Sequence, residues 1–72
     1  MIDSQDPLID RLIRRLDTGD SLHRRNTAGA LRLHGPRAVG AIPALTQLLA
    51  DEDDRVRNEA QRALDRIRRT AS

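Results

Sequence analysis

The 72-residue sequence contains no cysteine, no lysine and no Phe, Tyr or Trp. Without cysteine there is neither a disulfide framework nor a thiolate metal site. Without aromatic residues, the core must be built from Leu, Ile, Val and Ala. No stretch approaches the roughly 18 apolar residues of a membrane span, and the opening residues Met1–Ser4 are acidic and poor in apolar side chains. We therefore expect a cytoplasmic protein without a membrane segment.

The charges of the two signs nearly balance. Thirteen arginines and eleven acidic residues give a net charge of +2, although the calculated pI is about 10.9. The pI is high because arginine stays protonated at any ordinary pH. A dedicated nucleic-acid-binding protein carries a stronger charge asymmetry than this, so nucleic acid is the less favoured partner.

Apolar residues recur at helical spacing along the whole chain, and alternation at period two is absent, so we expect an all-α fold. Residues 1–72 form one domain, close to the lower size limit for a single core. We expect four helices, at about residues 7–16, 20–34, 36–50 and 53–70, the last fraying at residues 68–70.

The ends of the expected helices carry the usual capping residues. Aspartates serve as N-caps of the first, second and fourth helices, and Gly35 followed by Pro36 stops the second. We expect Gly40 and Pro43 to kink the third. The predicted inward-facing residues are Leu8, Ile9, Leu12, Ile13 and Leu16 of the first helix, Val39, Ile42, Leu45, Leu48 and Leu49 of the third, and Val56, Ala60, Ala63, Leu64 and Ile67 of the fourth.

The second half of the chain repeats the first after a shift of 33 residues. The shift aligns Ile9 with Ile42, Leu12 with Leu45, Leu16 with Leu49, Asp20 with Asp53, Arg24 with Arg57, Ala30 with Ala63 and Leu31 with Leu64. A helical repeat of this length is typical of an α-solenoid, in which each hairpin buries its apolar face against a neighbour.

The second half also carries a run, AIPALTQLLADEDDRVR at residues 41–57, followed by apolar residues at Ala60, Ala63, Leu64 and Ile67. This pattern resembles a HEAT repeat of the short bacterial type found in phycobilisome-lyase-like proteins, and the first half resembles it less closely. The resemblance implies a right-handed α-α superhelix of two tandem hairpins, residues 7–35 and 36–69. Members of this family are mostly protein-binding scaffolds.

The same resemblance implies a polar ladder between repeats, formed by an Asp after the first helix and an Arg six residues later. Asp51 and Arg57 match this pattern. Arg24 matches in the first copy, but Thr18 stands where its Asp is expected, and His23 replaces an expected Val. The pattern of the ladder is therefore incomplete in the first copy.

The two copies differ in a consistent way. Leu22, Gly29 and Leu33 of the second helix correspond to Arg55, Arg62 and Arg66 of the fourth, whereas Arg11 and Arg15 correspond to Ala44 and Leu48. We expect each apolar member to face the other repeat and each arginine to face away. This predicts a two-repeat solenoid fragment capped at both ends, because terminal repeats need a polar outer face.

No catalytic or metal-binding pattern is visible. His23 and His34 lie eleven residues apart, roughly 16 Å along a helix, which is too far to share a metal. We expect them to be packed, partly solvated imidazoles. The acidic run Asp51–Asp54 lacks the ligand spacing and the glycine of a calcium loop, so it indicates a helix N-terminus. We predict a protein that is not an enzyme and that uses no cofactor and no metal.

The resemblance places the second and fourth helices on a concave face. The predicted partner-binding residues there are Arg24, Arg25, Arg32, Asn58, Gln61 and Arg68. In one interpretation these residues form a binding site for an acidic protein segment or for phosphates. In the other they form a solvated face, in which Arg24 belongs to the ladder and Arg68 complements the helix dipole.

The leading hypothesis is a protein-interaction module with an unidentified, acidic protein partner, and the alternative is arginine-mediated binding to a nucleic-acid backbone. Glu59 and Asp65 weaken the positive field that the alternative requires. A monomer is favoured, and the sequence also permits a homodimer.

Overall fold

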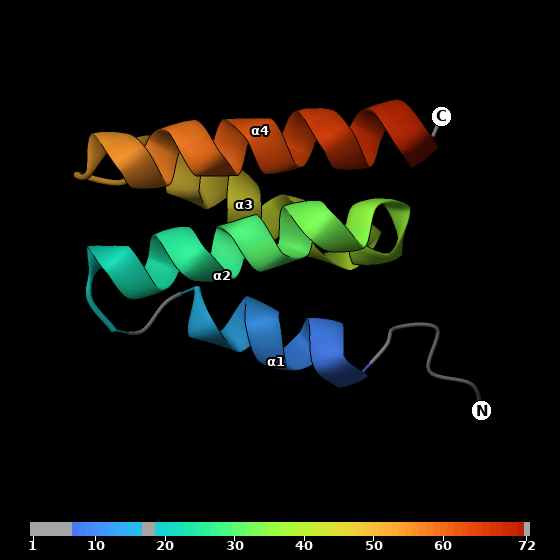
Figure 1. Cartoon of the computed structure of the whole chain (residues 1–72), viewed down its shortest axis with the longest axis horizontal. Helices are drawn as coiled ribbons and strands as arrows, with labels where there is room; N and C mark the ends of the chain where they lie inside the picture. The colour runs from blue at the N-terminus through green and yellow to red at the C-terminus, as the bar shows by residue number, and fades with distance from the viewer. Residues whose placement is uncertain (1–6, 17–18, 72) are drawn as a thin grey trace.

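The computed structural model describes residues 7–16 and 19–71, which form two helical hairpins (Figure 1). The elements are α1 (Pro7–Arg15), α2 (Ser21–His34), the 3₁₀ helix η1 (Gly35–Ala41), α3 (Ile42–Gln47), the 3₁₀ helix η2 (Leu48–Ala50) and α4 (Asp54–Ala71). α1 and α2 make the first hairpin, and the segment η1–α3–η2 makes the second with α4. The predicted all-α fold of two tandem hairpins is thus confirmed.

α2 occupies the middle of the molecule. It lies between α1 and α4, runs in the same direction as α4, and has the segment that contains α3 behind it (Figure 1). α2 and α4 pack extensively against each other, and α4 also covers η1, α3 and η2. Because α2 has neighbours on three sides, one side of it remains open to solvent.

The predicted caps hold α2 and α4 in place. The Asp20 carboxylate accepts the His23 backbone N–H at 2.9 Å, and the Asp53 carboxylate accepts the Arg55 backbone N–H at 2.7 Å. Gly35 ends α2 with a φ of +62°, a conformation that residues with a Cβ rarely adopt. The cap predicted at Asp6 lies outside the described residues.

α4 continues to Ala71, one residue past the end predicted for the fourth helix. Its last fully buried residue is Ile67. In the described part of the chain, no helix combines the length and the apolar character that crossing a membrane requires.

The third segment departs from a continuous α-helix more than its predicted kink implies. Pro43 has no N–H and its ring would clash with the carbonyl of residue 39 in a regular α-helix. Accordingly, the N–H of Ile42 bonds to the Val39 carbonyl in a tighter turn, and Ala38 has non-helical angles. The segment therefore divides into η1, α3 and η2.

This division explains an error in the predicted core. A 3₁₀ helix has three residues per turn, so every third residue shares a face, and Gly35, Ala38 and Ala41 are the buried residues of η1. Val39 was predicted to face inward from an α-helical period and is instead exposed. Leu8 and Leu49, near the ends of their segments, are also exposed, which corrects the prediction for both.

The hydrophobic core of the described residues is built from aliphatic side chains of both hairpins. Its buried members are Ile9, Leu16, Ala28, Leu31, Ala38, Ala41, Leu45, Leu48, Val56, Ala60, Ala63, Leu64 and Ile67. Leu12, Ile13, Ile42 and Ala44 pack against them. Ala44 and Leu48 thus face the interior, as the comparison of the two copies predicts.

The orientation predicted for the open side of α2 is wrong. Leu22 and Leu33 were expected to press against the second hairpin, but they are 57% and 72% exposed. The reason is geometric: Leu31 is fully buried, and a residue two positions away on a helix points about 200° further around the axis. α2 cannot bury both Leu31 and Leu33 against the same neighbours.

The contrast between these two leucines gives a stability test on one helix. Replacing Leu31 with Ala should cost about 2–5 kcal/mol, comparable to the whole stability of a domain this small, and should leave the chain largely unfolded in water. Leu33→Ala should change stability by less than about 0.5 kcal/mol. Urea denaturation followed by circular dichroism measures both, and equal losses would contradict the observed burial.

Candidate functional site

Arg24 connects the two hairpins through a buried carboxylate. Its Nε lies 2.8 Å from Asp51 Oδ2 and one terminal nitrogen lies 3.2 Å from Oδ1, so the guanidinium makes a bidentate ion pair with the carboxylate. The side chains of Arg24 and Asp51 are only 19% and 8% exposed. Arg24 also donates to the Gly19 carbonyl. Arg24 therefore has a structural partner in the second repeat, although its own repeat lacks the expected Asp.

Asp51 organises the loop between η2 and α4. Its Oδ1 accepts the Asp53 backbone N–H at 3.0 Å, and its backbone carbonyl accepts a hydrogen bond from Arg57 at 2.6 Å. The hydrogen bond from Arg24 lowers the pKa of Asp51, and the same bond raises the pKa of Arg24. Arg57 reaches the main chain of Asp51 and the carboxylate of Asp54. The Asp51 side chain thus pairs with Arg24 of the first repeat, whereas Arg57, its expected ladder partner, bonds to the Asp51 backbone carbonyl.

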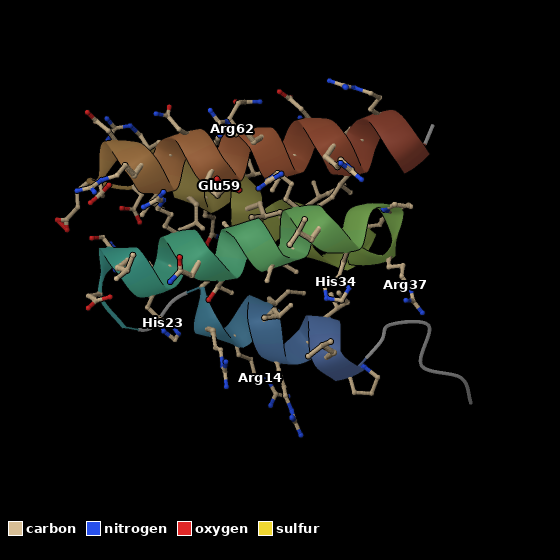
Figure 2. The ribbon with its side chains drawn as sticks, in the orientation of Figure 1. Arg14, His23, His34, Arg37, Glu59 and Arg62 are labelled. Atoms are coloured by element: carbon tan, nitrogen blue, oxygen red, sulfur yellow. The ribbon has the colours of Figure 1, made fainter. Side chains whose placement is uncertain are left out.

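A second ion pair joins α2 to α4 further along. Arg32 Nε lies 2.6 Å from Glu59 Oε2, and the Glu59 side chain is only 13% exposed. Figure 2 shows Glu59 between the two helices. Glu59 lies against Gly29, where a Cβ would stand in van der Waals contact, 3.4 Å from Glu59 Oε2. Arg32 is therefore also engaged within the fold.

The six predicted partner-binding residues differ in their surroundings. Arg24 and Arg32 hold carboxylates, as described above. Asn58, Gln61 and Arg68 are exposed on α4, where Gln61 bonds to Asp65 of the same helix. Arg25 is exposed on α2 and lines two shallow hollows, neither of which includes the three α4 residues. Of the predicted set, Arg25 and Arg32 line hollows together with an exposed leucine, and Arg32 is held there by Glu59.

The residues around Arg25 form a surface that we call the α2 face. Seen down the helix axis, its members fall within an arc of about 100°: they are Leu22, Arg25, Asn26, Gly29 and Leu33. One hollow on this surface is lined by Ser21, Leu22, Arg25, Asp53 and Arg55. The other is lined by Arg25, Asn26, Gly29, Ala30, Arg32, Leu33 and Glu59. The α2 face therefore borders the seam between α2 and α4.

The exposed leucines are the feature that sequence reasoning placed wrongly. The signal was present: α2 carries apolar residues on two opposite sides, and only one side can meet the core. Its buried side includes Ala28 and Leu31, whereas Leu22 and Leu33 lie on the other.

The remaining candidate residues are the two histidines and the acidic run at residues 51–54. His23 is exposed, which corrects the prediction that it is packed, and its ring would meet a Cβ at Gly19. His34 is half-buried. Within the described ranges, no three His, Cys, Asp or Glu residues are grouped so that they could hold a metal ion. The acidic run serves the start of α4, where hydrogen bonds from the Arg55 backbone lower the pKa of the Asp53 cap.

The Arg24–Asp51 pair predicts a pH-dependent stability. Because the folded-state pKa of Asp51 is depressed, the pair stabilises the fold fully above the unfolded-state pKa of about 3.9. That contribution is lost as the pH falls through the lower folded-state pKa. Asp51→Asn should therefore be less stable than the wild type at pH 7, and the difference should shrink below about pH 4.

Urea denaturation at several pH values measures this difference. Asp65→Asn is the matched control, because Asp65 is exposed and accepts a hydrogen bond from Gln61 of the same helix. A destabilisation by Asp51→Asn that is the same at pH 7 and pH 3 would contradict the assigned role of its charge.

Comparison with known families identifies the repeat. A family model of HEAT repeats matches residues 4–72, which include both hairpins. No curated protein and no solved structure matches the chain. HEAT repeats are generally protein-interaction scaffolds and are typically non-catalytic. The paired hairpins, the 33-residue period and the match along nearly the whole chain agree, and the protein belongs to the HEAT repeat family.

Proposed function

We propose that this HEAT repeat protein is a non-catalytic interaction module that holds a protein partner on the α2 face. The observation that carries the proposal is the exposure of Leu22 and Leu33, at 57% and 72%, on a helix whose other sides are packed. Exposed apolar residues grouped beside polar ones mark interaction sites more often than single scattered ones do. The α2 face replaces the broader arginine-lined surface that the sequence predicted.

The alternative, binding to a nucleic-acid backbone, receives less support. Two of the arginines expected to contact phosphates, Arg24 and Arg32, are engaged by Asp51 and Glu59. The chain offers no aromatic side chain to stack on a base, and stacking contributes much of single-strand binding.

Affinity capture from the source cells tests the proposal with two matched double variants. Leu22→Ser with Leu33→Ser removes both apolar groups of the α2 face. Leu8→Ser with Val39→Ser removes two exposed apolar side chains elsewhere on the surface, which are 47% and 46% exposed. We expect the first variant to recover at least about tenfold less partner protein, the size of effect expected from losing central interface residues, and the second to recover as much as the wild type.

Equal recovery by the wild type and by the Leu22→Ser, Leu33→Ser variant would contradict the proposed face. Recovery of nucleic acid alone, with an affinity that falls steeply as salt is added, would favour the alternative. Circular dichroism shows whether each variant keeps its helical content.

A further inference from the structure

The partner of the α2 face can be described further by its chemistry, an inference that rests on the proposed function. We propose that the α2 face binds an acidic amphipathic helix, with apolar residues that cover Leu22 and Leu33 and a carboxylate that pairs with Arg25. Two features of the surface support this assignment: the spacing of the leucines and the positive charge beside them.

The spacing of the two leucines suits a helix lying along α2. Eleven residues separate Leu22 from Leu33, which corresponds to about 16 Å along the helix axis and three helical turns. A partner helix with apolar residues at i, i+4, i+7 and i+11 presents one continuous stripe over the same length. It would therefore cover both leucines along a single line of contact.

Gly29 shapes the middle of that line. It lies between the two leucines, and the hollow around it is also lined by Arg25, Arg32 and Glu59. The Glu59 side chain lies beside this point of the helix, 3.4 Å from where a Gly29 Cβ would stand. Between the two leucines the partner helix would therefore pass the Arg32–Glu59 pair, and polar residues of the partner would face it there.

The charges along the seam favour an acidic partner. Asp53 and Glu59 are already satisfied, the first by capping α4 and the second by Arg32. Arg25 has no hydrogen bond or ion pair among the described residues, and Arg55 only approaches Asp53 at 3.9 Å while its side chain is 74% exposed. The positive charge of Arg25 and Arg55 is thus available, whereas the negative charge of the seam is not.

The same charges argue against a second copy of this chain as the occupant. An α2 face packed on another α2 face would bring Arg25 and Arg55 of both copies into one interface without an uncommitted carboxylate. Like charges brought together at an interface disfavour association. An acidic helix supplies the missing charge.

A display library tests the inference with the whole chain as bait. The library consists of 18-residue helical peptides with Leu at i, i+4, i+7 and i+11 and with Glu, Lys or Gln at each flanking position. We expect selection on the wild type to enrich Glu over Lys. An enriched peptide should bind the Arg25→Glu variant at least about tenfold more weakly, a size of effect typical of a paired charge at an interface.

One double variant and one NMR spectrum separate the possible outcomes. Binding of the enriched peptides should be lost in Leu22→Ser with Leu33→Ser. In the unmodified protein, the peptide should shift the backbone amide signals of Leu22, Asn26, Gly29 and Leu33 in NMR spectra. This second readout needs no variant to fold.

Enrichment of Lys, or no charge preference, among peptides that still need the two leucines would overturn the acidic partner and leave the proposed face in place. Peptides that bind regardless of the leucines and shift amides elsewhere would overturn both. Sedimentation that shows a dimer, dissociated by the double leucine variant, would overturn the inference in favour of a second copy.

Discussion

The packing of α2 against α4 joins the two hairpins, and the other features of the molecule depend on it. Leu31 and Leu64 supply buried apolar contacts in the shared core. At the edge of the seam, Arg24 pairs with Asp51 and Arg32 with Glu59, and each pair links residues 27 positions apart. Arg24 and Arg32 are eight residues apart, about 12 Å along α2, so the two pairs together fix the position of one hairpin along the other.

This seam also decides which side chains of α2 remain exposed. Arg24 and Arg32 are engaged in it, and Arg25, one position beyond Arg24, points to the outside with Leu22 and Leu33. The sequence predicted a cationic groove, whereas the structure exposes two leucines on α2 with Arg25 beside them. Such a surface suits protein recognition, because buried apolar contacts contribute affinity while a charged group contributes selectivity.

The sequence predicts much of this fold because its signals are local. The caps at Asp20 and Asp53, the stop at Gly35 and the 33-residue repeat each depend on neighbouring residues or on simple alignment, and the structure confirms them. The division of the third segment was only partly predictable, since Pro43 signals a kink but not the change to three residues per turn that buries Ala38 and exposes Val39.

The site was harder to predict because it depends on how the hairpins dock. The sequence shows apolar residues on two sides of α2 but does not show which side meets the core. The partner of Arg24 was missed because its carboxylate comes from Asp51 of the following repeat, whereas the pattern search expected it at Thr18. Contacts between repeats are set by the docking of whole helices, which no single motif encodes.

The most direct test of the central claim is the solvent accessibility of individual leucine methyl groups on α2. NMR relaxation in the presence of a soluble gadolinium chelate measures it without any substitution. The docked arrangement predicts strong broadening of the methyl signals of Leu22 and Leu33, with those of Leu31 protected. Protection of Leu22 and Leu33 to the same degree as Leu31 would contradict it.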